Sequence, residues 1–259
     1  LVQKAPPERR LSEPCTMHTY FVASRGESST EQDGNAGLLS RWRSAWESSG
    51  WRTRVLTEEE ASTHPNYQEL RSALYALPTT NPKEYEVACF LRHLAMSAVG
   101  GGWMADYDVV PLALPACAAP SFEGKYTTHE GFVPALVSGS SDEYLRVTRL
   151  FAAIPWRENP RVFSFEAKPH VSDMLALQYL MQQGQITTYP LLRCGVVEAS
   201  DVFGGGGEVN CKNVCPPPPA PAGGKAAAGG VSGGQLGFGP LGAHFSHASV
   251  EVLKERAAA

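Results

Sequence analysis

The spacing of apolar and polar positions predicts a strand, a helix and a second strand in the N-terminal part of the chain. Residues 17–24, MHTYFVAS, are a short apolar, aromatic-rich run that is typical of a strand. Residues 38–50 form a helical pattern that Gly50 closes, with apolar positions at Leu38, Leu39, Trp42, Ala45 and Trp46. Residues 51–57 return to an extended pattern. This order predicts a mostly parallel sheet covered by helices.

Capping residues mark two further helices. Thr57 and Glu60 have the spacing of a capping box, in which each side chain accepts a hydrogen bond from the other residue's backbone amide. Residues 172–184 have Ser172 at the N-cap position and Gly184 as a stop. Both segments are therefore predicted to be helical.

The clearest helix precedes a glycine-rich stretch. Asn81 is expected as its N-cap, with Pro82 at the first helical position and Glu84 two residues later. Gly100 supplies the left-handed stop. The apolar residues of this helix recur at spacings of three and four and form one stripe: Val87, Phe90, Leu91, Leu94, Ala95 and Ala98.

The C-terminal half predicts mixed α/β structure and one interruption. Residues 125–140 have an extended pattern and residues 142–154 a helical one. Residues 204–240 consist largely of Gly, Pro and Ala, and their apolar surface is too small to offset the entropy of ordering, so we expect a disordered insertion. Residues 241–259 are expected to return to the domain with a short strand or loop and a final helix.

Composition and charge narrow the class of protein. With 259 residues, 43% of them hydrophobic, the chain can form one large domain or two small ones. Lys and Arg number 22 and Asp and Glu 26, giving a net charge of −4 without a basic run, which argues against nucleic acid as a partner. The sequence contains no run of about eighteen apolar residues, which is the length that a membrane-spanning helix needs. Because the chain begins at Leu1, we expect a fragment or processed product, and an upstream signal or anchor could precede it.

Six cysteines permit disulfides but do not form a dense scaffold. Cys211 and Cys215 have a spacing that two zinc ligands would tolerate, yet no second pair follows at the distance of a zinc finger. We therefore favour disulfides or free thiols over zinc. No Asn-x-Ser/Thr glycosylation signal is present, and the compartment stays open.

The candidate chemistry lies in residues 100–112, GGGWMADYDVVPL. In an extended segment Asp106 and Asp108 would point to the same side, while Tyr107 points to the other. Two adjacent carboxylates repel each other, and Mg²⁺ or Mn²⁺ would relieve that repulsion and leave positions for a diphosphate. The alternative is that Asp-x-Asp is a solvated strand end and that the three glycines merely stop the helix.

Residues 90–112 resemble the DxD region of GT-A-fold glycosyltransferases, in the family whose sugar-binding region has an Arg, an apolar helix, Gly-Gly, an aromatic residue and Asp-x-Asp-Val. The resemblance is looser over residues 17–60. It implies an α/β fold of the GT-A, Rossmann-like type, with a mixed, mostly parallel sheet flanked by helices. It divides the chain into an N-terminal tail (1–16), the glycosyltransferase domain (17–203), the Gly/Pro/Ala insertion (204–240) and a C-terminal segment (241–259) that completes the domain.

The same resemblance assigns residues to the cofactor site. Asp106 and Asp108 match the pair that holds Mn²⁺ or Mg²⁺ and the ribose and diphosphate of a nucleotide sugar, and Arg92 matches an arginine near the donor. Gly101 and Gly102 are expected to let the backbone approach the donor closely. The chain departs from the family at Cys89, where an Asp is common, and this departure affects contacts with the donor sugar.

A histidine near the C-terminus usually supplies a third metal ligand in this fold. Residues 242–249, GAHFSHAS, resemble that segment, and either His244 or His247 could serve, with His244 preferred. Asp173 opens a helix where the family often has an acidic residue, so it is a candidate catalytic carboxylate, although the helix dipole alone favours an acid there. Glu130 and Asp142 are weaker candidates. Three tryptophans are assigned to the core: Trp42, Trp46 and Trp51.

These observations predict a metal-dependent glycosyltransferase, a hexosyltransferase by resemblance, that transfers a sugar from a nucleotide diphosphate sugar to a glycan, protein or lipid hydroxyl. Retention and inversion both stay open, with the resemblance leaning toward retention. A non-catalytic sugar-nucleotide binding protein and a metal-dependent phosphohydrolase are the alternatives. The resemblance favours the Golgi or ER lumen, with a membrane contacted only through an anchor outside this chain.

Overall fold

The computed structural model describes residues 15–22, 29–120, 122–188, 196–198 and 242–245. The predicted insertion at residues 204–240, the N-terminal tail as far as residue 14 and the expected final helix lie outside these ranges. No helix in the ranges is both long enough and apolar enough to cross a membrane.

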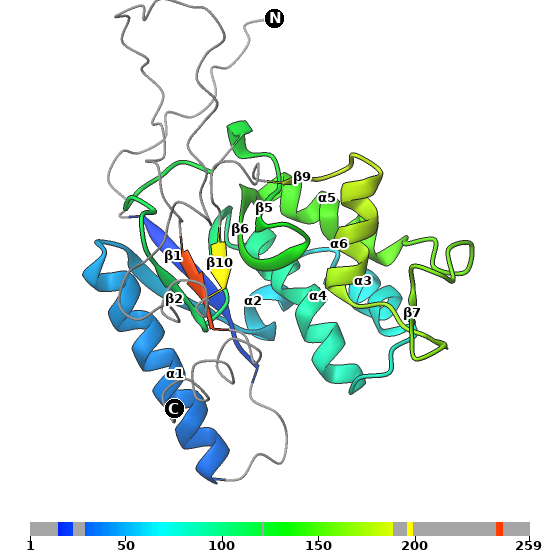
Figure 1. The fold of residues 1–259 in the computed structure, drawn as a ribbon, viewed down its shortest axis with the longest axis horizontal. Helices are drawn as coiled ribbons and strands as arrows, with labels where there is room; N and C mark the ends of the chain where they lie inside the picture. Colours follow the sequence, from blue (N-terminus) through cyan, green and yellow to red (C-terminus); the bar gives the residue numbers. More distant parts are fainter. Residues whose placement is uncertain (1–14, 23–28, 121, 189–195, 199–241, 246–259) are drawn as a thin grey trace, which may run out of the picture.

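A six-stranded mixed sheet forms the centre of the molecule, with the strand order β2-β1-β3-β6-β5-β9 (Figure 1). Three strand pairs are parallel and two are antiparallel. The strands are β1 (Thr16–Tyr20), β2 (Arg52–Leu56), β3 (Gly101–Ala105), β5 (Thr127–Glu130), β6 (Val133–Ser140) and β9 (Thr187–Thr188). The prediction of an α/β fold with a mostly parallel sheet flanked by helices is therefore confirmed.

Helices cover both faces of this sheet (Figure 1). Helix α1 (Ser29–Ser48) packs on one face, where Trp42 and Trp46 join Trp103 in one buried cluster. The other face carries the larger cluster, to which the neighbouring Met104 belongs. The helices on that side are α2 (Glu58–Ser62), α3 (Tyr67–Tyr75), α4 (Lys83–Ala98), α5 (Ser141–Ala152) and α6 (Asp173–Gln182).

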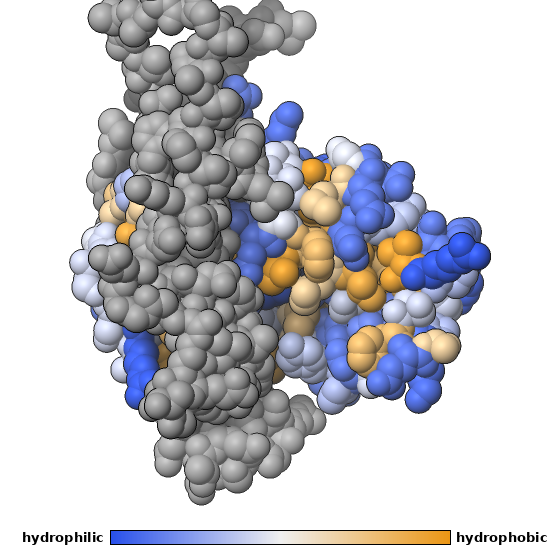
Figure 2. Space-filling view, viewed as in Figure 1, coloured by the Kyte–Doolittle hydropathy of each residue, from blue (hydrophilic) through white to orange (hydrophobic). Residues whose placement is uncertain are grey.

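Short elements complete the fold. A three-stranded sheet has the order β10-β11-β4, formed by Val196–Glu198, Gly242–His244 and Val109–Pro111. A two-stranded hairpin joins β7 (Ser164–Phe165) to β8 (Lys168–Pro169), and a 3₁₀ turn covers Phe122–Gly124. In the view of Figure 2, hydrophobic residues form a band over the region of β6 and α6, with hydrophilic residues around it.

Most predicted helix signals are confirmed. Thr57 and Glu60 form the capping box, and the Ser172 hydroxyl accepts a hydrogen bond from the Leu175 amide at 3.2 Å. Gly50 and Gly184 have positive φ angles of 85° and 66° after their helices. The three tryptophans assigned to the core are at most 3% exposed: Trp42, Trp46 and Trp51.

Three boundary predictions are wrong. Helix α1 begins at Ser29, well before the start at residue 38 that the apolar pattern predicted. Helix α4 begins at Lys83 with Pro82 as its N-cap, because the Asn81 side chain donates a hydrogen bond to Glu86 Oε1 at 2.5 Å instead of capping the helix. Strand β1 ends at Tyr20, earlier than the apolar pattern suggested.

A disulfide between Cys15 and Cys117 joins positions 102 residues apart in the sequence. It ties the segment that follows β4 to the beginning of β1. The indole of Trp103 holds the same segment by donating a hydrogen bond to the Ala118 carbonyl at 2.8 Å. The expectation of disulfides or free thiols is confirmed for this pair and for the free thiol of Cys89, whereas Cys211 and Cys215 lie outside the described residues.

Candidate functional site

The candidate site lies where the order of the strands reverses. The chain passes from β1 to β2 on one side of β1, and then crosses to β3 on the other side. Open α/β sheets bind ligands at the carboxyl ends of strands at such a switch point. The ends of β1 and β3 meet here, since the rings of Phe21 and Tyr107 lie 5.9 Å apart in an edge-to-face contact.

Asp106 and Asp108 lie in a turn between β3 and β4, so the prediction that they belong to an extended strand is wrong. The Asp106 amide donates to the Ala135 carbonyl of β6 at 2.8 Å, and the Asp106 carbonyl accepts from the Val109 amide at 3.0 Å. The second hydrogen bond closes the turn. The two carboxylates still influence each other: burial raises the pKa of Asp106 to about 6, against the charge of Arg92 and with a contribution from Asp108.

Arg92 connects two carboxylates from distant parts of the sequence. Its guanidinium donates to Asp106 Oδ1 at 2.7 Å and also pairs with Asp173 Oδ2. Burial alone would lower the pKa of Arg92, but the charges of Asp106 and Asp173 outweigh burial and raise it. The side chain of Asp173 is 6% exposed, so this carboxylate, at the start of α6, is held inside the protein.

Strand β11 brings His244 to the Asp turn. The strand pairs antiparallel with β4, so that His244 lies opposite Val109, and the Phe245 amide donates to the Asp108 carbonyl at 2.9 Å. His244 Nε2 consequently lies 3.5 Å from Asp108 Oδ2. His247, the other predicted candidate, lies outside the described residues.

Glu130, the last residue of β5, also meets this histidine. Its Oε1 lies 3.1 Å from His244 Nδ1, on the opposite side of the ring from Asp108. Burial disfavours the charged imidazole, but the carboxylates of Asp108 and Glu130 beside the ring outweigh burial and raise the pKa of His244 to about 10. The sequence analysis ranked Glu130 low, and the only signal for it was its place at the end of an extended run before Gly131.

Gly101 and Gly102 have a structural reason to be glycines. A Cβ on Gly101 would lie 2.5 Å from the Ser141 amide nitrogen, and φ at this residue is +79°. Gly102 has φ of +112°, and the nearest atom to a Cβ there would belong to His18. These positions let β3 pass close to the junction of β6 and α5. Their expected contact with a cofactor stays a prediction.

A metal ion would find a partial set of ligands here. Within the described ranges no group of three or more His, Cys, Asp or Glu side chains is arranged to hold an ion. Asp108 Oδ1, however, is buried without a hydrogen-bond partner among the described residues. Mg²⁺ and Mn²⁺ are commonly held by one or two protein side chains and by phosphate oxygens of the substrate. Asp108 and His244 fit that mode of binding.

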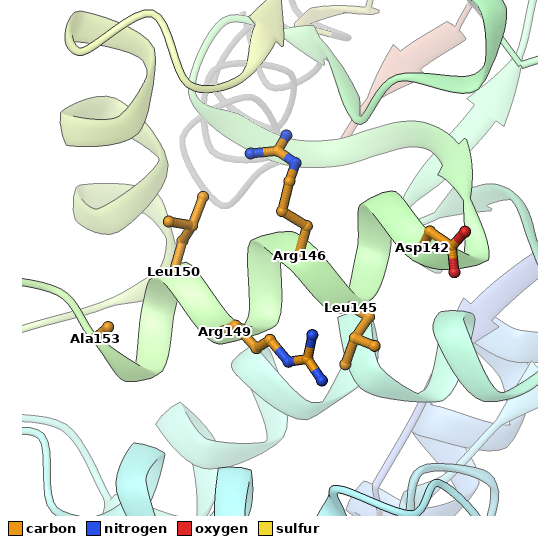
Figure 3. Close-up of a pocket in the computed structure, with 6 residues that line it drawn as sticks. All are labelled: Asp142, Leu145, Arg146, Arg149, Leu150 and Ala153. Atoms are coloured by element: carbon orange, nitrogen blue, oxygen red, sulfur yellow. The ribbon is translucent and has the colours of Figure 1, made fainter.

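A hollow elsewhere on the surface shares no residue with this cluster. It lies along α5, and Figure 3 shows Arg146 and Arg149 pointing in different directions from that helix. Asp142, a weaker sequence candidate, lines this hollow at the start of α5 and is exposed. The structure therefore does not bring Asp142 to the other candidate residues.

These features define an α/β protein with a cluster of carboxylates, one arginine and one histidine at the carboxyl edge of its sheet. Comparison with known families finds a match over residues 7–123 to a family described as a domain of unknown function, DUF8765. The match covers less than half of the chain and includes the Asp turn. No curated protein matches the sequence.

Proposed function

We propose that this protein is a metal-dependent glycosyltransferase with a GT-A-type fold. The observation that carries the proposal is the Asp106–Asp108 turn at the carboxyl end of β3, next to the switch point, with His244 brought to Asp108 by β11. The same residues carry the sequence resemblance to the DxD region. The mixed sheet, with helices on both faces, is compatible with this fold.

In this proposal Asp108 and His244 hold Mn²⁺ or Mg²⁺, and the donor diphosphate completes the ligand set. Asp108 Oδ1 is buried and has no hydrogen-bond partner in the described part of the chain, which supports a cation at this position. When bound, the ion would stabilise negative charge on the leaving diphosphate.

Asp106 and Asp173 have a different role, which follows from their contacts with Arg92. Arg92 pairs with both carboxylates and is itself buried, so the three side chains form one ion-paired cluster. We assign Asp173 to holding Arg92, since a carboxylate that is 6% exposed and ion-paired is poorly placed to accept a proton from an acceptor. These ion pairs also concern Cys89, the position at which the family commonly has an Asp. Arg92 has two carboxylate partners here although position 89 is a cysteine.

The proposed reaction forms a bond between the acceptor hydroxyl oxygen and the anomeric carbon of the sugar. The bond from that carbon to the diphosphate breaks, the diphosphate leaves with its electron pair, and the acceptor proton is released. Hexoses are the proposed sugars, and a glycan, protein or lipid is the proposed acceptor.

A panel of nucleotide sugars with Mn²⁺ tests the proposal. Release of nucleotide diphosphate together with sugar transfer would support it. Release of monophosphate would indicate a phosphohydrolase. Nucleotide binding without turnover, with every donor and acceptor tried, would indicate a non-catalytic binding protein.

Asp108→Asn provides the test of the site itself. We expect this change to abolish Mn²⁺-dependent nucleotide binding, because the amide keeps the shape but removes the charge that attracts the ion. The fold should change little. Calorimetric titration of nucleotide with and without Mn²⁺ measures the effect, and Asp142→Asn on α5 is the matched control. Equal affinity of Asp108→Asn and the parent protein would exclude Asp108 from the site.

The Cys15–Cys117 disulfide supports an oxidising compartment. Stable disulfides persist in secreted proteins and in the lumen of the secretory pathway, and are rare in the cytosol. We therefore place the protein in the ER or Golgi lumen as part of this proposal. Alkylation of the protein in cells, before lysis, would detect free Cys15 and Cys117 thiols if the compartment were reducing.

A further inference from the structure

The carboxylates of Glu130 and Asp108 lie at the two nitrogen atoms of the His244 ring, and the three residues come from different parts of the fold. Glu130 Oε1 lies 3.1 Å from Nδ1, and Asp108 Oδ2 lies 3.5 Å from Nε2. Glu130 ends β5, Asp108 precedes β4, and His244 ends β11. The side chains of Glu130 and His244 are only 14% and 12% exposed, so solvent competes little for their hydrogen bond.

The two contacts of the ring differ in length. The distance to Glu130 is that of an ordinary hydrogen bond, whereas 3.5 Å to Asp108 is long for one. Two atoms that bind the same ion at about 2.1 Å lie roughly 3 to 3.5 Å apart. The separation of His244 Nε2 and Asp108 Oδ2 therefore suits two ligands of one ion better than it suits a direct hydrogen bond.

We propose that Glu130 is the positioning residue for His244, accepting a hydrogen bond from Nδ1–H so that Nε2 faces Asp108 as a metal ligand. An ion at Nε2 would displace the proton from that nitrogen, and an acceptor at Nδ1 keeps the second ring proton in place and leaves the Nε2 lone pair to the ion. Histidines that bind metals commonly donate their second ring N–H to such a partner. This inference rests on the proposed function.

The backbone holds both ends of this hydrogen bond. Thr127 and Thr128 pair with β6 on one side and with β9 on the other, and the register shifts before Glu130. His244 is held by the pairing of β11 with β4. Because strand pairing positions both backbone segments, rotation of the His244 side chain is what its partners must fix. A carboxylate at Nδ1 removes that freedom of rotation.

Binding of Mn²⁺ alone to the full chain, measured by calorimetry and by electron paramagnetic resonance, tests the inference. Glu130→Ala should weaken Mn²⁺ binding about 10- to 100-fold, as expected when such a partner is lost. Glu130→Gln keeps an acceptor oxygen but loses the charge, and should weaken binding roughly 3- to 10-fold. Glu158→Ala, which removes an exposed carboxylate from a loop, is the control and should leave the affinity unchanged.

A second measurement separates positioning from loss of charge. Nitrogen NMR of the His244 ring in the Mg²⁺-loaded protein should show the Nδ1–H tautomer in the parent and in Glu130→Gln. In Glu130→Ala it should show a mixture of tautomers. Circular dichroism confirms that each variant is folded. If Glu130→Ala does not fold, Glu130→Gln decides, and a Mn²⁺ affinity equal to that of the parent overturns the inference.

The outcomes distinguish this inference from the proposed function. Loss of Mn²⁺ binding in Asp108→Asn and His244→Ala, with unchanged binding in Glu130→Ala, would overturn the role of Glu130 and leave the function standing. Unchanged Mn²⁺ binding in all three variants would overturn both.

Discussion

At the scale of single residues, Arg92 is the centre of a cluster whose two carboxylates, Asp106 and Asp173, come from distant parts of the chain. Arg92, Asp106 and Asp108 could be singled out because helix, glycine and carboxylate signals follow one another within one short stretch. The contact between Arg92 and Asp173 joins residues 81 positions apart and depends on α6 packing beside α4. No local pattern encodes that packing, so the sequence predicted Asp173 as a candidate catalytic carboxylate and not as a partner of Arg92.

Glu86 shows how burial near this cluster affects stability. It is 3% exposed, accepts a hydrogen bond from Asn81 at Oε1, and has no partner for Oε2 among the described residues. Burial raises the pKa of Glu86 from 4.5 to about 7, the hydrogen bond from Asn81 opposes the rise, and the charge of Asp173 adds to it. The folded state therefore binds this proton more tightly than the unfolded state does.

The sign of the pH dependence follows from that difference. Between pH 4.5 and about 7 the unfolded chain loses the Glu86 proton while the folded protein keeps it, so the free energy of unfolding falls as pH rises. Glu86→Gln should remove this fall, and at pH 8 the variant should be more stable than the parent by on the order of 2–3 kcal/mol. Near pH 4.5 the two proteins should be similar. Urea denaturation at both pH values measures this, and a difference that does not change with pH would contradict the assignment.

At the scale of elements, local signals predicted most helices, because caps and stops act within a few residues. Ser172 caps α6, and the Thr57 capping box begins α2, as their spacing indicated. The Asp turn was misjudged because its hydrogen bonds depend on Ala135 in β6, a strand that follows later in the chain. Strand β11 is short and follows a long low-complexity tract, so its pairing with β4 could be suspected only through the resemblance.

The entry to β3 gives a prediction about one element. Gly101→Ala would place a Cβ 2.5 Å from the Ser141 nitrogen and 2.7 Å from the Gly139 oxygen, both of them backbone atoms that cannot easily move. The positive φ of 79° adds strain. We expect a loss of at least ~3 kcal/mol in the free energy of unfolding.

Gly100→Ala is the matched control for that change. Its φ is +98°, but no atom lies within 4 Å of a Cβ there. The free energy of unfolding should therefore fall only by the backbone strain, which is about 1–2 kcal/mol. Chemical denaturation of both variants separates steric overlap from strain. Equal losses in the two variants would show that the close approach of β3 to the junction of β6 and α5 is not tightly packed.

At the scale of the whole molecule, the fold brings together parts of the chain that the sequence keeps far apart. His244 and Glu130 are 114 residues apart, and β11 must reach β4 across the low-complexity tract before the two side chains can meet. The sequence could indicate the class of sheet because strands and helices alternate in its first part. It could not indicate that six cysteines would include the Cys15–Cys117 pair, since pairing depends on the placement of the segment after β4 beside β1.

The disulfide supports the last prediction, which concerns global stability. Cys15 and Cys117 close a loop of 102 residues, and removing such a link increases the conformational entropy of the unfolded chain, which corresponds to about 4–5 kcal/mol in the loop-closure description. The double variant Cys15→Ser/Cys117→Ser should lose a similar amount in urea denaturation. Each single variant breaks the same bond, so Cys15→Ser or Cys117→Ser alone should cost nearly as much as the double change. Additive losses, with each single change costing half, would mean that the two cysteines stabilise the fold by packing separately and not through a shared covalent bond.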